Sequence, residues 1–564
     1  MFAVRVLVEH GGPIVVSKPP GLFATNPRVG CLSRHIMTST SLFASGPPKI
    51  TTHYTIRPRE SDERWKDVNM ERFADECDVV IVGGGPSGLS TAIRLKQLNG
   101  DLRVCLVEKA AEIGGHILSG AVIETRALDE LLPDWRNMDS PIKQDVKRER
   151  LAYLTSSASI TLPILPGNPL RNHGNKIVRL GHVVKWLGQQ AEAAGVELYP
   201  GYAAAEVLFH DDGSVKGIAT NDVGIAKDGS PKESFERGME LHAKVTVFAE
   251  GCRGHLTKSL WPKFNLYSDA VPMSYAIGLK ELWELDPAKH DPGYVEHTMG
   301  WPMTSKDYGG SFIYHLDDSG QPLASIGFVT ALDYTNPYFN PFQTFQKWKT
   351  HPSIRKHLEG GKRLAYGARA INEGGLHCIP KLSFPGGLLI GCAAGFLNVA
   401  KIKGTHNAMK SGMLAAEAIV DAFPKETETK GLNVTSYEDA IKSSWIWSEL
   451  RQMRNIRTSF NALGGVWGMM AYGALYHLSR GKEPFTFKFH EPDHKRLKPA
   501  KDCQSIDYPK PDGVLTFDLL SSVALTGTNH ESDQPPHLTL LDDSVPTQVN
   551  LSQYDGPEGR FCPA

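Results

Sequence analysis

The chain has 564 residues, a formal net charge of −1, and 22% charged and 41% hydrophobic residues. This length suffices for several domains with large cores, and the balanced charge gives no indication of a nucleic-acid partner. The eight cysteines are sparse and follow no paired spacing, so we expect reduced thiols rather than a disulfide scaffold.

The first fifty residues differ in composition from the rest. Glu9 is their only acidic residue, whereas five residues are lysine or arginine and the run 37–41 is rich in hydroxyl groups. This profile predicts a mitochondrial transit segment at 1–50. A disordered N-terminal tail is the alternative.

A strand, a glycine turn and a helix follow one another from position 78. A β-branched run leads into Gly83, Gly85 and Gly88, and a second strand pattern ends in Glu108. In a dinucleotide site these glycines permit a tight turn, close approach of a pyrophosphate, and close packing of helix on strand. The helix N-terminus then faces the phosphates, and Glu108 accepts from ribose hydroxyls. The pattern predicts dinucleotide binding; an ordinary βαβ unit with a glycine-rich turn is the alternative.

Three further segments resemble FAD-dependent oxidoreductases. Lys109 continues from the acid as in their E-K-x-x-x-x-G-G motif, and 245–251 resembles the strand that closes over the flavin with Gly251. The segment 387–405 resembles their second flavin motif, in which Gly391 follows a strand and Gly404 and Thr405 begin a helix that faces the flavin with its N-terminus. The resemblance implies FAD as the cofactor. No second GxGxxG motif exists, so no separate nicotinamide-nucleotide domain is visible.

Two positions leave part of this flavin assignment open. Cys392 stands where the superfamily has aspartate after glycine, which weakens the ribityl-binding assignment there. Arg179 precedes an apolar helical pattern at 182–187 and resembles a phosphate-contacting arginine of flavoenzymes. A surface salt bridge is the alternative for Arg179.

From about residue 50 to its last residue, the chain closely resembles the electron transfer flavoprotein–ubiquinone oxidoreductase family. The landmarks are 50–56, 201–213, 308–312, 398–406 and 496–503. The resemblance implies an α/β fold with a discontinuous Rossmann-like FAD domain, an α+β ubiquinone-binding domain and a partial ferredoxin-like C-terminal domain. The expected boundaries are 70–270 and 365–425 for FAD, 271–364 and 426–484 for ubiquinone and membrane, and 485–564 for the iron–sulfur part.

The implied function is to accept electrons from reduced electron transfer flavoprotein and to reduce ubiquinone to ubiquinol. The implied location is the matrix side of the mitochondrial inner membrane, with peripheral membrane contact. We expect no catalytic acid, base or nucleophile, because the flavin carries the electrons and the protein supplies placement and potential. The alternatives are an FAD-dependent monooxygenase, an isoprenoid reductase, or a non-catalytic membrane flavoprotein.

Gly309 and Gly310 match the quinone-binding glycines of the family. Paired glycines expose backbone N–H and C=O groups with no side chain in the way, so a flat carbonyl ring can approach them. A strand bulge or a turn is the alternative.

Two stretches are candidates for contact with the membrane in which the quinone dissolves. The first is 116–123 with its continuation to 131–135. The second is 432–450, where Tyr437, Ile441 and Trp445 share one helical face, Trp447 broadens it, and a basic stripe of arginines follows at 451, 454 and 457. Tryptophan beside arginine is typical of an interfacial helix. The alternative is an amphipathic core helix with a solvated basic face.

The segment 458–479 carries no formal charge, but its glycines and polar residues favour a buried or interfacial segment over a membrane span. The family has one cysteine in an Arg-Phe-Cys-Pro-Ala context and three more further on, which together supply the four thiolates of a [4Fe-4S] cluster. Here Cys562 stands in that context as the only one of the four ligands. We expect either an incomplete sequence or a product without its cluster.

Overall fold

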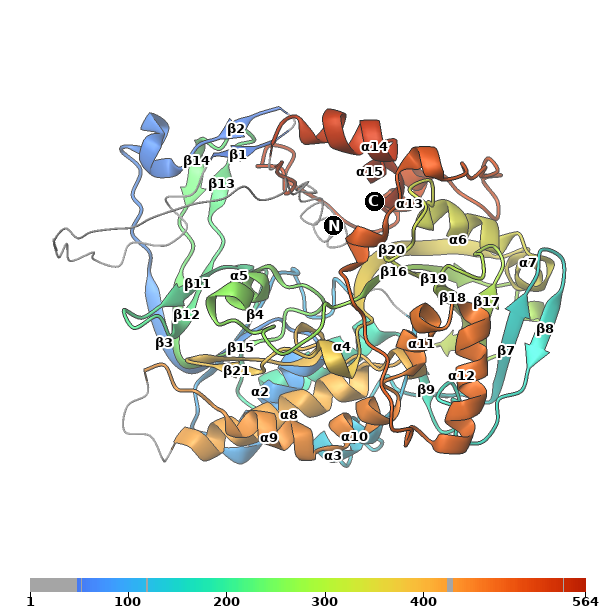
Figure 1. Cartoon of the computed structure of the whole chain (residues 1–564). Helices are drawn as coiled ribbons and strands as arrows, with labels where there is room; N and C mark the ends of the chain where they lie inside the picture. Colours follow the sequence, from blue (N-terminus) through green and yellow to red (C-terminus); the bar gives the residue numbers. More distant parts are fainter. Residues whose placement is uncertain (1–47, 52, 118–119, 424–429, 541, 564) are drawn as a thin grey trace, which may run out of the picture.

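Two large sheets, one mainly parallel and one mainly antiparallel, organise the computed structural model of the chain (Figure 1). The structure describes residues 48–563 apart from 52, 118–119, 424–429 and 541. All but the last three residues of the predicted transit segment at 1–50 lie outside the described residues.

The first sheet has eight strands, in the order β10-β4-β3-β15-β12-β11, with β22 pairing with β15 and β21 with β22. Its strands are β3 (Ala74–Val82), β4 (Val104–Glu108), β10 (Glu197–Pro200), β11 (Ala204–Phe209), β12 (Val215–Thr220), β15 (Glu240–Phe248), β21 (Ser383–Phe384) and β22 (Gly387–Leu389). The strands β10, β4, β3, β15 and β22 run parallel. Their carboxyl ends therefore meet at one edge of the sheet.

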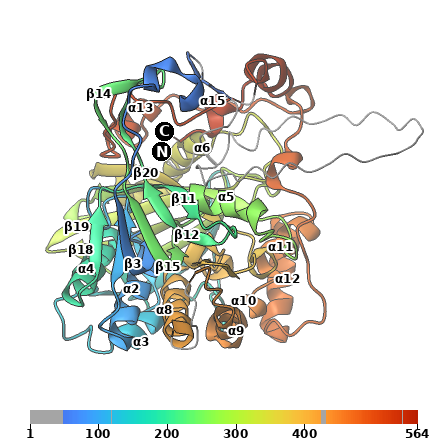
Figure 2. The ribbon, with the colours of Figure 1, turned by 90° about the vertical axis from the view of Figure 1, so that its left-hand side faces the viewer.

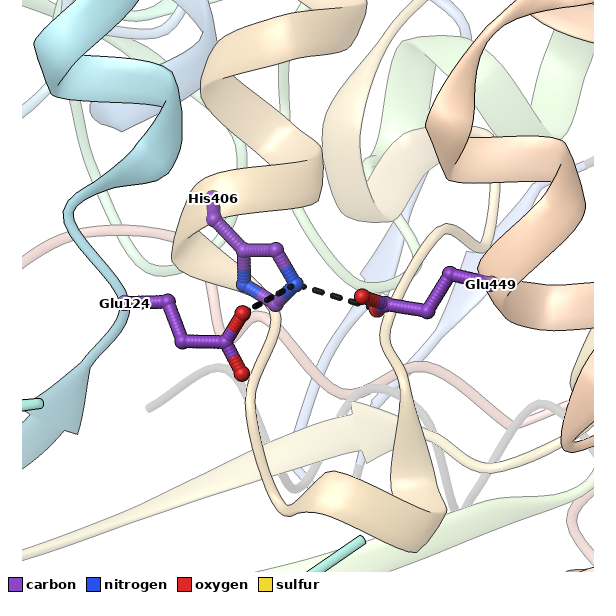
Figure 3. Close-up of side chains that lie close together, drawn as sticks. All are labelled: Glu124, His406 and Glu449. Carbon is purple, nitrogen blue, oxygen red and sulfur yellow. Dashed lines mark hydrogen bonds and ion pairs between the residues drawn. The ribbon is translucent and has the colours of Figure 1, made fainter. Parts of the chain in front are cut away.

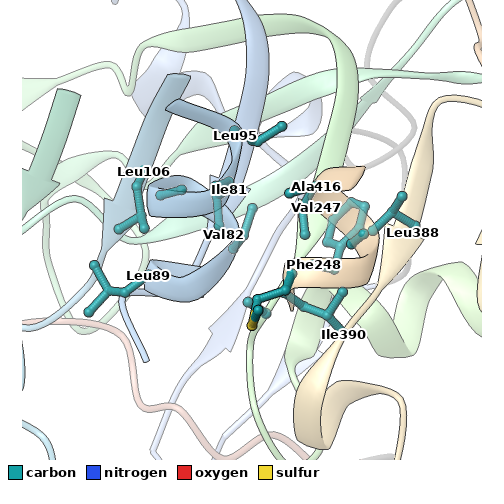
Figure 4. Close-up of a cluster of buried hydrophobic side chains, with 14 of the residues drawn as sticks. Ile81, Val82, Leu89, Leu95, Leu106, Val247, Phe248, Leu388, Ile390 and Ala416 are labelled. Carbon is teal, nitrogen blue, oxygen red and sulfur yellow. The ribbon is translucent and has the colours of Figure 1, made fainter. Parts of the chain in front are cut away.

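Helices α2 (Pro86–Leu98) and α8 (Thr405–Ala422) pack on this sheet and on each other (Figures 1 and 2). Ile81, Leu106, Val247 and Leu388 point from four neighbouring strands into the shared core (Figure 4). Because parallel strands are covered on both faces, they read as continuous apolar runs rather than alternating ones. This confirms the nucleotide-type α/β fold expected from the first glycine motif.

The second sheet has seven strands, in the order β20-β16-β19-β18-β17-β7-β8. They are β7 (Arg148–Leu154), β8 (Ser159–Leu162), β16 (Tyr275–Glu284), β17 (Tyr294–Gly300), β18 (Gly309–Asp318), β19 (Gln321–Ala331) and β20 (Lys362–Asn372). The boundaries expected from the sequence divide the chain differently. The expected boundaries assign β7, β8 and most of β20 to the flavin domain. In the structure these strands belong to the second sheet, because β7 pairs with β17 and β20 pairs with β16.

Short elements connect and cover the two sheets. The strands are β1 (Lys49–Ile50), β2 (Thr55–Ile56), β5 (Ala121–Ile123), β6 (Gln144–Asp145), β9 (Lys176–Val178), β13 (Val223–Ile225) and β14 (Pro231–Glu236). The helices are α3 (Arg126–Leu131), α4 (Leu180–Ala193), α5 (His255–Lys263), α6 (Pro341–Lys349), α7 (Pro352–Leu358), α9 (Ser436–Ser443), α10 (Trp445–Gln452), α11 (Ile456–Ala462), α12 (Val466–Ser479), α13 (Leu519–Ala524), α14 (Ser552–Tyr554) and α15 (Glu558–Phe561).

The interpretation of 432–450 as one helix with a membrane-facing side is wrong. The chain is extended at Ser444, which caps α10, so α9 and α10 are separate helices. Tyr437 and Ile441 are fully buried against α8 and the first sheet. Trp445 stacks on His406 with ring centroids 5.7 Å apart. The apolar face is thus a core face, as the alternative interpretation held.

The other candidate membrane stretch is also mainly core. Val122, Ile123, Leu131 and Trp135 are all buried, because β5 and α3 pack beneath α8 and beside β9. The residues 118–119 of this stretch lie outside the described part of the chain. Among the described residues, no helix has the length and apolarity that crossing a bilayer requires; the segment 458–479 is divided between α11 and α12.

Candidate functional site

The turns that follow β3, β4, β15 and β22 lie together at the carboxyl edge of the first sheet. The Gly83 N–H donates to the Val107 carbonyl (2.9 Å), and the Ala249 N–H donates to the Val82 carbonyl (2.9 Å). These bonds hold the turn after β3 between the ends of β4 and β15. Ligands of open α/β sheets bind at this edge.

Each glycine of the first motif has its own geometric reason. Gly83 has φ +110°, and a Cβ there would lie 2.6 Å from the Ala249 carbonyl oxygen. At Gly88 a Cβ would lie 2.1 Å from the Gly83 carbonyl oxygen, so only glycine lets α2 start this close to β3. Gly85 faces open space, and this is the side that a pyrophosphate needs if it is to approach the helix N-terminus.

Glu108 anchors the same turn from the end of β4. Its carboxylate accepts hydrogen bonds from the N–H of Gly84 (2.9 Å) and of Ala110 (2.8 Å). These bonds orient the half-buried carboxylate at the end of the glycine turn, the position from which a dinucleotide ribose is bound in this fold.

The second flavin motif packs directly on the first. Gly391 has φ +59°, its N–H donates to Ser411 Oγ (3.0 Å), and a Cβ would lie 2.7 Å from Ser87 Oγ. Gly404 and Thr405 begin α8, which packs along α2, so that a Cβ at Gly412 would lie 2.4 Å from the Ser87 carbonyl oxygen at the start of α2. Gly251 has φ +77° in the turn after β15. The structure thus brings all three predicted flavin segments together.

Three cationic side chains lie close together near this edge, although they are far apart in the sequence: Lys109, Lys280 and Arg369. Burial and the nearby Arg369 guanidinium lower the pKa of Lys109 to about 7 and that of Lys280 to about 8. The Lys280 ammonium donates to the Gly120 carbonyl (2.7 Å), and Arg369 donates to the His116 carbonyl (3.2 Å). Like charges in a low-dielectric site destabilise one another unless an anion joins them. The Glu108 and Glu250 carboxylates offset this only in part at Lys109, whose pKa stays lowered. The residues of this edge therefore fit FAD, whose pyrophosphate is an anion.

Arg179 lies at the start of α4 and forms an ion pair with Asp318 of β18. Its Nε atom is buried and has no hydrogen-bond partner among the described residues. The ion pair with Asp318 is the contact expected if Arg179 forms a salt bridge. Because the Nε–H group has no partner among the described residues, Arg179 could also donate to a phosphate, and that role stays a prediction.

Gly309 and Gly310 begin β18, and their positions explain why no side chain is present. A Cβ at Gly309 would lie 2.2 Å from the Val329 carbonyl oxygen, and one at Gly310 would lie 2.9 Å from the Thr298 carbonyl oxygen. The preceding Tyr308 packs edge-on against Phe460 of α11 (5.1 Å between ring centroids). The glycines thus lie in a regular ladder rather than in a bulge, next to the helices of the 458–479 segment.

The basic stripe expected at 451, 454 and 457 does not form. Arg454 donates to backbone carbonyls, including that of Gly481 (2.7 Å). Arg457 is buried, and its guanidinium lies 4.0 Å above the Tyr308 ring. Because the chain turns between α10 and α11, the third arginine points inward, which helical spacing alone could not reveal.

A compact ion network lies at the start of α8 (Figure 3). His406 Nε2 is 3.0 Å from Glu449 and 3.7 Å from Glu124, and Lys401 Nζ lies 2.7 Å from Glu124 and 2.8 Å from Glu449. Although burial opposes ionisation, His406 and Lys401 lower the pKa of Glu449 to about 2. Since the Lys401 ammonium already lies within 2.8 Å of both carboxylates, we describe the group as an ion network and assign no metal to it.

Cys562 follows α15 and lies near β20, where the Tyr366 hydroxyl donates to the Pro563 carbonyl (2.7 Å). A [4Fe-4S] cluster takes four thiolates. In the described part of the C-terminal segment, from 513 to 563, Cys562 is the only cysteine. These residues by themselves do not make a complete ligand set, so we derive no step through a cluster.

Comparisons with known proteins match each part of this architecture. Family models match at residues 275–371 ("ETF-QO, ubiquinone-binding"), 513–564 ("Electron transfer flavoprotein-ubiquinone oxidoreductase, 4Fe-4S") and 81–133 ("NAD(P)-binding Rossmann-like domain"). A geranylgeranyl bacteriochlorophyll reductase-like protein from Thermoplasma acidophilum shares the fold, with a TM-score of 0.54 and 19% identity over 75% of this chain and 96% of its own.

Two curated relatives carry the same name, "Electron transfer flavoprotein-ubiquinone oxidoreductase, mitochondrial". The Bos taurus protein is 64% identical over 525 residues, which cover 92% of this chain and 85% of the relative. The Caenorhabditis elegans protein is 63% identical over 520 residues, which cover 91% and 87%. At this identity and coverage the chain belongs to the electron transfer flavoprotein–ubiquinone oxidoreductase family, and it is an FAD-dependent oxidoreductase.

Proposed function

We propose that this protein accepts electrons from reduced electron transfer flavoprotein and passes them to ubiquinone at the matrix side of the mitochondrial inner membrane. One observation carries the proposal. The segment that leads into the paired glycines of β18 packs on α11 and is hydrogen-bonded to α12, whose exposed face is apolar, and the same chain forms a flavin-type nucleotide edge. An electron carrier and a lipid-soluble acceptor can therefore be held in one molecule.

The chain's own residues divide the binding of FAD among them. Gly83, Gly85 and Gly88 with the α2 N-terminus hold the pyrophosphate, and Glu108 accepts from the ribose. Lys109 and Arg179 add positive charge to the phosphate region. The remaining cofactor residues are those of the other two segments, namely Gly251, Gly391, Gly404 and Thr405. When bound, FAD supplies the capacity to take up and release electrons.

The start of β18 provides the quinone position. Gly309 and Gly310 are half-buried and carry no side chain, and we assign the flat carbonyl ring of the quinone to this start of the strand. Val466, the first residue of α12, donates its N–H to the Ser305 carbonyl (2.9 Å). The loop that precedes the glycines is therefore tied to the helix that exposes apolar side chains.

Membrane contact is assigned to α12 and the β7–β8 hairpin. Trp467 (61% exposed), Leu475 (41%) and Leu478 (86%) share one face of α12, which has no charged residue. Ile160 of β8 is 53% exposed, and Tyr153 of β7 packs against Trp467 with ring centroids 5.4 Å apart. A contiguous exposed apolar surface of this kind marks an interaction with a membrane or a partner.

The test is electron transfer by the FAD-loaded chain. Reduced electron transfer flavoprotein and ubiquinone-1 are mixed with it, and ubiquinol formation is followed by absorbance. We expect turnover that depends on all three components. Rapid reduction of the bound flavin by NADPH, with no ubiquinol formed from the reduced flavoprotein, would instead favour a monooxygenase or an isoprenoid reductase.

A further inference from the structure

A buried cluster of acids and arginines lies directly behind Tyr308. It consists of Asp333, which follows β19; Glu373, which follows β20; Asp493 and Arg496 of the 3-10 helix η8 (Asp493–Arg496); and Arg457 of α11. Asp333, Glu373 and Arg457 are all more than 90% buried. The flavin and quinone assignments above do not use these groups.

The contacts form a continuous path from the surface inward. The Arg496 side chain is 30% exposed, and its Nη1 donates to Asp333 Oδ2 (2.9 Å). Arg457 donates through Nη2 to the same Oδ2 atom (3.2 Å) and through Nε to Glu373 Oε2 (3.2 Å). The Ser274 hydroxyl accepts from Arg457 Nη2 (3.3 Å), and the Ser274 carbonyl accepts from the Glu373 N–H (2.7 Å). The next residue, Tyr275, donates its N–H to Asp493 Oδ2 (2.7 Å). Asp333 and Glu373 thus share Arg457, and the Ser274–Tyr275 backbone joins Glu373 to Asp493.

The cluster holds three carboxyl groups but only two guanidinium groups. A buried group of charges with one uncompensated carboxylate is costly, so the cluster favours binding one proton. Burial, with a smaller contribution from the Asp333 carboxylate, raises the pKa of Glu373 to about 7 and that of Asp493 to about 7, although Arg457 opposes both shifts. Asp333 is also buried, but Arg457, Asn461 and Arg496 keep its pKa low. The proton therefore belongs to Glu373 and Asp493 as a coupled pair.

The titratable groups around Glu373 and Asp493 come from several elements that pack on this pair. Besides Arg457 and Asp333, the neighbours are Tyr308 before β18 and Cys378 after β20. Burial raises the pKa values of both, that of Cys378 to about 12, so both stay neutral near pH 7. Glu373 and Asp493 are thus the groups of this cluster that exchange a proton at physiological pH.

The cluster reaches the proposed quinone position through Tyr308. The Arg457 guanidinium covers the Tyr308 ring at 4.0 Å. After burial, the Glu373 carboxylate is the largest influence on the hydroxyl of Tyr308. Gly309 and Gly310 come next in the chain, so the Arg457–Glu373 pair lies against the residue that adjoins the proposed quinone position.

We propose that this cluster supplies the protons of quinone reduction, with Glu373 as the inner donor and the half-buried Asp493 as the acid that takes up protons from water. The inference rests on the proposed function. Ubiquinone takes up two electrons, which come from reduced electron transfer flavoprotein, and two protons to become ubiquinol. Each proton leaves Glu373 for a quinone oxygen, and Asp493 then returns a proton from water to Glu373.

The test compares two electron acceptors with E373Q, which keeps the side-chain size but cannot release a proton. The FAD-loaded protein is reduced with dithionite and mixed in a stopped-flow instrument with ubiquinone-1 or with ferricenium, which takes one electron and no proton. We expect E373Q to reduce ubiquinone-1 about a hundredfold more slowly, the lower range for loss of a general acid, and ferricenium at the wild-type rate. The wild-type rate with ubiquinone-1 should fall above about pH 7, and the rate of E373Q should lose this dependence.

Two further variants make the experiment decisive. D493N changes the half-buried outer acid and provides a second variant if E373Q does not fold. It should slow repeated turnover with ubiquinone-1 but not with ferricenium. E281Q is the matched control, because Glu281 is fully buried in the same sheet and pairs with Lys349 (2.9 Å). Per bound FAD, it should keep both rates. The proton route would be overturned if E373Q and D493N reduced ubiquinone-1 at the wild-type rate and with the wild-type pH profile. It would also be overturned if these variants lost the same fraction of their rate with ubiquinone-1 and with ferricenium. Failure of the wild type itself to reduce ubiquinone-1 would overturn the proposed function instead.

Discussion

At the residue scale, Glu108 joins the glycine turn to the ribose position through one carboxylate. Glu108→Ala removes that acceptor, and hydrogen bonds to charged groups contribute about 1.5–3 kcal/mol. We therefore expect FAD to bind about ten- to a hundredfold more weakly, measured as flavin retained after extensive dialysis. Glu108→Gln keeps one carbonyl acceptor and should lose less. Unchanged flavin content in Glu108→Ala would remove Glu108 from the ribose site.

The buried arginine shows why residue roles depend on context. Arg451, Arg454 and Arg457 have the spacing of one solvated helical stripe, but only Arg451 is exposed. Arg457 instead neutralises Asp333 and Glu373, which come from loops more than eighty residues away in the sequence. Tertiary contacts determine the partners of a buried charge. The helical spacing of the three arginines therefore predicted an exposed basic stripe that the folded chain does not form.

At the element scale, α12 rather than α9 or α10 exposes the apolar face. Trp467→Glu combined with Leu478→Glu should release the protein from vesicles of phosphatidylcholine and cardiolipin without unfolding it. Burying one large apolar side chain is worth about 1.5–3 kcal/mol, so binding should weaken at least about tenfold in a sedimentation assay.

Trp445→Glu is the matched control on α10. It should leave vesicle binding intact in the folded fraction but lower the melting temperature, because Trp445 stacks on His406 and donates to Glu130 (2.9 Å). The reverse result, with release by Trp445→Glu and none by the α12 changes, would return the membrane face to the segment 432–450.

At the scale of the whole molecule, buried histidines and buried acids oppose each other in the pH dependence of stability. Burial lowers the pKa of His297 and His315 to about 3 and that of His357 to about 4, against about 6.5 in the unfolded chain. Between about pH 4 and 6.5 the unfolded chain therefore binds more protons at these sites, and stability falls as the pH falls. Glu373 and Asp493, with raised pKa values, bind protons in the folded chain over a similar range and reduce this loss.

His315→Gln should therefore flatten the decline in unfolding free energy between about pH 6.5 and 4, and E373Q should steepen it. Each group changes the slope by at most about 1.4 kcal/mol per pH unit. Urea unfolding at a series of pH values measures both slopes. Parallel curves for the wild type and both variants would show that these groups do not titrate differently on folding.

The sequence by itself determined the elements that local rules govern. The first glycine motif, its flanking strands and the acid at position 108 predicted β3, α2 and β4, because the positive φ of Gly83 and the close contact of Gly88 with the Gly83 carbonyl are demands within one βαβ unit. The resemblance added the family and the cofactor, which the comparisons confirm. The individual flavin, quinone and cluster residues remain predictions.

Only the tertiary structure decided which faces are buried and which charges meet. The amphipathic pattern at 432–450 is the same whether its apolar face covers a core or lies in a membrane, and α8 happens to cover it. The sequence of α12 is apolar almost all round, so it does not show which face is exposed. Likewise, Glu373, Arg457 and Asp493 come from three distant segments, and a charge cluster with one shared proton arises only when the sheet and the helices place them together. Local sequence encodes backbone geometry and periodicity, whereas burial and electrostatic environment are properties of the packed chain.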